Sequence, residues 1–148
     1  MENLELFIDG ASSGNPGPSG IGVVILRDGR TAKEMSRFIG PATNNIAEYT
    51  ALIAALTECL KMRADHVLVN TDSQLLHRQL NGEYKVRQPH IAALYRQAVK
   101  LIACFKQVRI QHIRREFNKE ADRLAVKAIR QATRNDQTDF RASQPDEA

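Results

Sequence analysis

The spacing of apolar residues changes once along this chain of 148 residues, and that change restricts its fold more than any other feature. Before Gly40-Pro41, short apolar runs at 4–8, 21–26 and 32–39 predict three strands joined by turns rich in glycine, proline and serine. After that point, apolar residues recur at helical spacing from about 44 to 60, behind residues typical of a helix N-cap. The first third of the chain therefore predicts an antiparallel meander followed by a helix.

The rest of the chain alternates between the two periods. The expected elements are a buried strand at 67–69, helices at 74–80 and 89–102, a strand at 108–113 and a last helix at 118–132. This order predicts an α/β domain with a five-stranded mixed sheet, an antiparallel meander followed by parallel strands, flanked by helices. We expect one domain over 1–133 and a disordered polar tail over 134–148.

The net charge of +4 conceals a strongly basic segment. Residues 84–134 hold 13 lysines and arginines against 3 acids, whereas the segments before and after each carry a net charge of −3. Such a segment fits either a polyanionic partner or an ordinary solvated helix face. The two cysteines, Cys59 and Cys104, are expected to be reduced and buried. With no signal peptide and no apolar run that could span a membrane, we expect a cytoplasmic protein with no membrane partner.

Four acids interrupt the apolar pattern. Asp9 and Asp72 each end an apolar strand, whereas Glu48 and Asp122 adjoin the apolar stripes of two helices. A turn, a cap or an ion pair explains any one of them, but less easily all four. Carboxyl ends of neighbouring parallel strands meet at one edge of a sheet, so these carboxylates should converge. Converging carboxylates need a counter-ion, and a pair of Mg²⁺ ions would suit hydrolysis of a phosphodiester.

Four short motifs carry these acids. They are Asp9-Gly10-Ala11-Ser12 with Gly14-Asn15-Pro16-Gly17 behind it, Thr43-Asn44-Asn45-Ile46-Ala47-Glu48, Thr71-Asp72-Ser73-Gln74, and Asn118-Lys119-Glu120-Ala121-Asp122. In this order and on these elements, they resemble the motifs of the type 1 ribonucleases H, and the resemblance covers about residues 3–132. One motif would be weak support, but four together are specific.

The resemblance implies a ribonuclease H-like fold and an endonuclease that cuts the RNA strand of RNA/DNA hybrids, leaving 5′-phosphate and 3′-hydroxyl ends. It implies two Mg²⁺ ions, with Mn²⁺ as a substitute, held by the catalytic acids Asp9, Glu48, Asp72 and Asp122. It also implies nucleic-acid contacts from Gly10, Ser12, Asn15, Thr43, Asn44, Asn45, Ser73, Gln74, Arg114, Arg115 and Asn118. The expected partner is the hybrid itself, bound by a monomer without an obligate protein partner.

Two departures from the family pattern indicate a subgroup. No histidine lies within 113–118, where many members carry one, so Arg114 or Arg115 would supply a fixed cation there unless both are simply surface arginines. The segment 81–88 is too short for the basic protrusion of other members and offers only Lys85 and Arg87 as cations. Two alternatives use the same fold: a non-catalytic binder of hybrids or double-stranded RNA, and an integrase-like nuclease acting on DNA.

Overall fold

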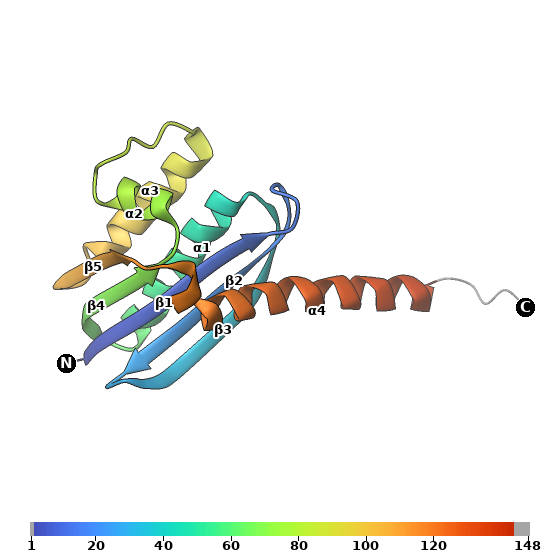
Figure 1. The fold of residues 1–148 in the computed structure, drawn as a ribbon, viewed down its shortest axis with the longest axis horizontal. Coiled ribbons are helices and arrows are strands. Elements are labelled where there is room, and N and C mark those ends of the chain that lie inside the picture. The colour runs from blue at the N-terminus through green and yellow to red at the C-terminus, as the bar shows by residue number, and fades with distance from the viewer. Residues whose placement is uncertain (1, 144–148) are drawn as a thin grey trace, which may run out of the picture.

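The computed structural model describes residues 2–143, with side chains as far as Arg134 (Figure 1). The elements in chain order are β1 (Glu2–Ser12), β2 (Gly17–Arg27), β3 (Arg30–Ala42), α1 (Asn44–Lys61), β4 (Ala64–Thr71), α2 (Gln74–Leu80), α3 (Pro89–Ile102), β5 (Gln107–His112), the short 3₁₀ turn η1 (Arg115–Phe117) and α4 (Lys119–Ser143).

The five strands form one sheet in the order β3-β2-β1-β4-β5. The first three pair antiparallel as a meander, and β4 and β5 then pair in parallel on the other side of β1. This topology confirms the mixed sheet predicted from the order of apolar patterns.

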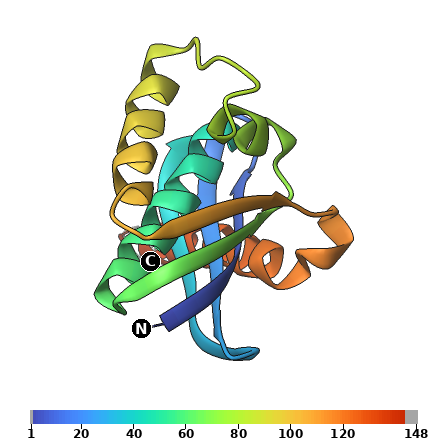
Figure 2. The ribbon, with the colours of Figure 1, turned by 90° about the vertical axis from the view of Figure 1, so that its left-hand side faces the viewer.

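Helices cover both faces of the sheet. Figure 2 shows α1 and α3 on one side of it and α4 on the other. The main core lies between the sheet and α1, where Leu6 and Ile8 of β1 meet Leu52 and Leu56 of the helix. On the opposite face α4 packs across β2, β1 and β3. The two helix layers therefore approach the central strand β1 from opposite sides.

Local side chains define where the helices begin. The Thr43 hydroxyl oxygen accepts a hydrogen bond from the Ile46 backbone N–H at 3.2 Å, which caps α1. Ser73 caps α2 in the same way through the N–H of Leu76. Pro89 occupies the first turn of α3, where its missing N–H costs no hydrogen bond.

Besides longer β2, β3 and β4 strands, the structure differs from the sequence predictions at three places. Strand β1 runs past Asp9 to Ser12, because β2 continues to pair with it up to Ser12↔Ser19. Helix α4 runs past the expected end near 132 to Ser143, across a stretch that contains neither glycine nor proline, while 144–148 of the expected tail lie outside the described residues. Cys104 is exposed rather than buried, because α3 ends at Ile102 before reaching it.

Within the described part of the chain, no helix combines the length and apolar character needed to cross a membrane.

Candidate active site

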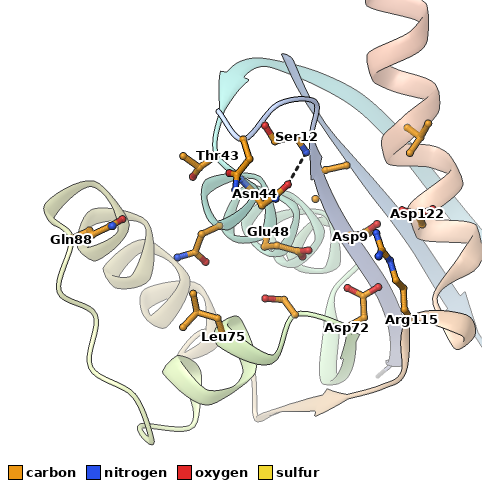
Figure 3. Close-up of a pocket in the computed structure, with 16 residues that line it drawn as sticks. Asp9, Ser12, Thr43, Asn44, Glu48, Asp72, Leu75, Gln88, Arg115 and Asp122 are labelled. Carbon is orange, nitrogen blue, oxygen red and sulfur yellow. Dashed lines mark hydrogen bonds between the residues drawn. The ribbon is translucent and has the colours of Figure 1, made fainter. Parts of the chain in front are cut away.

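Three carboxylates meet where the pairing of β1 with β4 ends. Ile8↔Thr71 is the last register pair of these strands, so Asp9 and Asp72 leave it side by side. Glu48 reaches the same point from α1, and one carboxylate oxygen from each of the three lies within 4.8 Å of the others. Asp122, in the first turn of α4, lines the same pocket (Figure 3). Three of the four acids thus form a close cluster, and Asp122 lies beside Asp9 in the same pocket.

Two glycines allow the helices to come this close to β1. A Cβ atom on Gly10 would lie 2.2 Å from the carbonyl carbon of Ala47, directly before Glu48 in α1. A Cβ atom on Gly22, the register partner of Asp9, would lie 1.9 Å from the Ala121 carbonyl oxygen in α4. Any side chain at either position would push away the helix that carries an acid of the site.

Burial and mutual repulsion change the acidity of the two most buried acids. Asp9 is 5% exposed, and its pKa is raised from 3.8 to about 8 by burial first, then by the charge of Asp72 and by contact with Asp122. The pKa of Glu48 is raised well above its usual range, again mainly by burial and then by Asp9. Without a counter-ion, burial and repulsion therefore favour the protonated forms of Asp9 and Glu48.

The donor set fits hard divalent cations. The clustered atoms are all carboxylate oxygens, the ligands that Mg²⁺ and Mn²⁺ prefer. Oε2 of Glu48 is buried and has no hydrogen-bond partner, although the backbone N–H of Gly10 donates to the same carboxylate. Burying a carboxylate oxygen without a hydrogen-bond partner costs free energy unless a cation binds it. The residues present thus fit a metal site.

Asn118 does not line the groove; its buried side chain is hydrogen-bonded to the strand and the carboxylate next to the cluster. It is 1% exposed, and its Nδ2 donates to the Ile8 carbonyl oxygen at 2.8 Å and to Asp72 Oδ2 at 3.3 Å. These bonds tie the end of η1 to the strand end that carries the acids. We expected Asn118 to contact nucleic acid; its burial and bonding instead place it behind Asp72.

The pocket around the acids is an open groove of about 900 Å³. Of the residues expected to bind nucleic acid, those lining it are Gly10, Ser12, Asn15, Thr43, Asn44, Asn45, Ser73 and Arg115. Gln74 and Arg114 do not line it. Arg114 lies before the 3₁₀ turn, is 81% exposed in its side chain and faces Glu116 at 3.8 Å. Of the two arginines, Arg115 lines the pocket and Arg114 does not.

Several hydroxyl groups at the groove are already partly engaged. The Ser12 hydroxyl donates to the Ala42 carbonyl oxygen at 2.7 Å. The Thr43 and Ser73 oxygens accept from helix N–H groups, which leaves their hydroxyl protons available to an incoming acceptor. Thr43 and Ser73 can therefore donate to a phosphate oxygen while still capping their helices.

Sequence reasoning missed four residues of the lining, namely Ala11, Leu75, Gln88 and Val126. Val126 was recognisable, because it lies one helical turn beyond Asp122. The sequence places Leu75 only in a short helix. In the structure it is an apolar residue at the surface, with 41% of its area exposed. Gln88, the N-cap residue of α3, also lines the groove, and no local pattern indicates this.

Comparisons with known proteins agree with this geometry. The model of the reverse transcriptase-like family matches residues 7–128. The chain is 42% identical over 123 residues to the bifunctional protein Rv2228c of Mycobacterium tuberculosis, covering 82% of this chain and 34% of that protein. It is 40% identical over 127 residues to ribonuclease HI of Halobacterium salinarum, covering 85% and 64%. The chain thus spans less than two thirds of the length of these curated relatives.

Solved structures give the same assignment. Ribonuclease H1 of Halobacterium salinarum superposes with a TM-score of 0.85 at 38% identity, covering 87% of this chain and 98% of that one. LC11-RNase H1, solved in complex with an RNA/DNA hybrid, superposes with a TM-score of 0.82 at 41% identity, covering 88% and 99%. On its fold, its converging acids and these similarities, the chain belongs to the type 1 ribonuclease H family.

Proposed function

We propose that this chain is a metal-dependent endoribonuclease that hydrolyses the RNA strand of RNA/DNA hybrids, leaving 5′-phosphate and 3′-hydroxyl ends. The observation that carries the proposal is the approach of Asp9, Glu48 and Asp72 to within 4.8 Å of one another at the base of an open groove. The hybrid bound by the similar LC11-RNase H1 supports the choice of substrate. Clustered acids would only weaken a purely non-catalytic binder, because they repel the phosphate backbone.

Asp9, Glu48 and Asp72 would hold one divalent ion, and Asp9 with Asp122 would hold a second. When bound, such ions supply a more acidic water for the attack and neutralise charge on the leaving oxygen. The other contributions come from the chain itself. Glu48, almost withdrawn from water, would accept from the 2′-hydroxyl beside the scissile phosphate, and that hydroxyl is what distinguishes RNA from DNA.

Groups around the acids would hold the backbone of the hybrid. The free hydroxyl proton of Thr43, at the positive end of the α1 dipole, suits a phosphate oxygen. Arg115 lines the pocket and would contact a phosphate as a fixed cation, because a guanidinium does not release its proton. It would take the position that a histidine holds in other members, consistent with the proposed subgroup.

A second, smaller hollow adjoins the groove. It holds about 190 Å³, shares Asn45, Leu75 and Gln88 with the groove, and adds Lys85 and Arg87. These two cations come from the short connection that replaces a basic protrusion. We propose that they contribute the grip on the nucleic acid that the protrusion provides elsewhere. We also propose that the protein works as a cytoplasmic monomer.

The test uses the chain with one end-labelled substrate strand at a time. An RNA/DNA hybrid, single-stranded RNA, double-stranded RNA and double-stranded DNA are each incubated with Mg²⁺, Mn²⁺ or EDTA. The proposal requires cutting of the RNA strand of the hybrid, abolished by EDTA, with 3′-hydroxyl ends that a polymerase can extend. Binding of the hybrid without cleavage in either metal would instead identify a non-catalytic binder, and cutting of double-stranded DNA would indicate an integrase-like nuclease.

A further inference from the structure

Two histidines from different elements lie next to each other where α2 packs on the edge strand β5. His77 belongs to α2, and His112 is the last residue of β5, with Thr71 of β4 as its register partner. The centres of the two rings are 5.9 Å apart, and the ring planes are tilted by 44°. Neither histidine lines the groove that holds the acids, so the proposed function leaves the pair unused.

The separation of the rings suits two imidazoles that share one metal ion. Because a zinc–imidazole bond is about 2.0–2.1 Å long, the centres of two rings on one tetrahedral ion lie about 5–6 Å apart. Imidazole nitrogen is a ligand that Zn²⁺, Cu²⁺ and Ni²⁺ prefer, whereas Mg²⁺ takes oxygen ligands. The pair therefore suits a different class of ion from the carboxylates of the groove.

Asn81 can fix the orientation of one of the rings. Its side-chain amide lies one helical turn beyond His77, with 2.9 Å between Nδ2 and Nε2 of the ring. With the amide turned so that its oxygen faces the ring, Asn81 accepts the Nε2 proton and leaves the lone pair of Nδ1 for a metal. Histidines that bind zinc commonly donate their other ring N–H to an oxygen in this way. His77 thus has the partner that such a ligand needs.

Two features of α2 favour a cation at this point. His77 lies in the last turn of the helix, where the partial negative charge of the free carbonyl groups attracts cations. The adjacent cation, Arg78, is already bound: its guanidinium donates to the Tyr84 hydroxyl oxygen at 3.0 Å and lies 5.2 Å from the centre of that ring. His77 is partly exposed and His112 is exposed, so an ion can reach both rings from solvent.

We propose that His77 and His112 together bind one Zn²⁺ ion, at a site separate from the acid cluster. Water would complete the coordination, so the ion would be exchangeable. Its effect would be to cross-link α2 to the edge strand β5. A helix of seven residues has little stability of its own, so this link would stabilise the native state wherever zinc is present.

Nitrogen NMR of the histidine rings tests the proposal, because the acid cluster contains no histidine and zinc bound there leaves these signals in place. The chain, without an affinity tag, is titrated with Zn²⁺ in an excess of Mg²⁺, which competes for the carboxylates. The ring nitrogens of His77 and His112 should shift together, with one midpoint and one ion per chain. Those of the other two histidines, His66 and His90, should stay in place.

Substitution of either histidine should remove the site. The loss of an outer partner of a metal ligand already weakens binding about 10–100-fold, so the loss of a ligand should weaken it at least as much. In His112→Gln the midpoint of the His77 shift should therefore rise at least about tenfold, and the converse should hold in His77→Gln. His90→Gln, at an exposed histidine of α3, is the matched control and should keep the parental midpoint.

An unchanged His77 midpoint in His112→Gln would overturn the proposal, as would separate midpoints for the two rings, because each would show that they do not share an ion. Equal shifts of all four histidines would show non-specific binding and would overturn it too. Circular dichroism without metal checks that each variant is folded. The readout requires no nuclease activity, so its result does not depend on the proposed function.

Discussion

The contact between Gly22 and α4 gives a prediction whose size follows from the structure. In Gly22→Ala the new Cβ atom would lie 1.9 Å from the Ala121 carbonyl oxygen and 2.8 Å from the Ala125 nitrogen, whereas ordinary contact begins at 3.4 Å. Both obstructing atoms are backbone, so no side chain can turn aside. The helix has to retreat by about 1.5 Å, and it carries Asp122 with it.

Two effects of different size should follow. Overpacking of this kind lowers the free energy of unfolding by roughly 1–3 kcal/mol. A displacement of a functional group by about 1 Å can cost on the order of 100-fold in rate, so kcat for hybrid cleavage should fall by at least that factor. The stability is measured by urea unfolding, and kcat with an end-labelled hybrid at saturating Mg²⁺, well below the melting temperature.

Gly29→Ala separates lost stability from lost geometry. Gly29 has a φ of +76°, and a Cβ atom added there would meet no other atom within 4 Å. Alanine at this position therefore costs about 1–2 kcal/mol of backbone strain without moving any neighbour. We expect Gly29→Ala to cleave like the parent despite its lower stability. If Gly22→Ala folds and also cleaves at the parental rate, the docking distance of α4 does not position Asp122, and the reasoning is refuted.

Three further predictions concern charge. Asp72→Asn should lower the rate of hybrid cleavage by roughly 10⁴-fold or more while the circular dichroism spectrum stays native. The free energy of unfolding without metal should stay equal or rise, because one repelling charge is lost. Cleavage at the parental rate would contradict the assignment of the site. The pKa of Asp9 is raised to about 8, so the native state binds this proton more tightly than the unfolded chain does. The free energy of unfolding without metal should therefore fall between about pH 4 and 8, and the rise in Tm caused by Mg²⁺ should grow over the same range. A rise in Tm that does not depend on pH would argue against Asp9 as a ligand. Arg115→Ala should raise KM about tenfold and reduce the salt dependence of hybrid binding by about one phosphate contact, whereas Arg114→Ala, outside the pocket, should bind like the parent.

The succession of strands and helices along the chain and the positions of the acids were predictable because each leaves a local mark in the sequence. Alternating or continuous apolar runs give strands, and a carboxylate at the end of such a run, as at Asp72, has no packing reason to be there. Asp122 was detectable for the same reason, as a charge beside an apolar helical stripe. These features depend on residues within one element, so a single sequence contains them.

Other parts of the site depend on contacts between elements and were not predictable. Nothing around Gly22 in the sequence indicates that α4 will lie against it, since the two are about a hundred residues apart. Which of Arg114 and Arg115 lines the pocket depends on the 3₁₀ turn η1. Asn118 belonged to a recognised motif, yet only packing shows that its amide faces Asp72 and the strand instead of solvent.

The bond from Asn118 to the Ile8 carbonyl oxygen joins the two ends of the domain, and this has a consequence for biosynthesis. During translation, β1 leaves the ribosome early, but its Asp9 meets Asp122 only when nearly the whole domain has been made. The growing chain therefore carries an incomplete set of acids throughout synthesis. Nuclease activity would begin only with the completed fold, because Asp122 is the last of the four acids to be made.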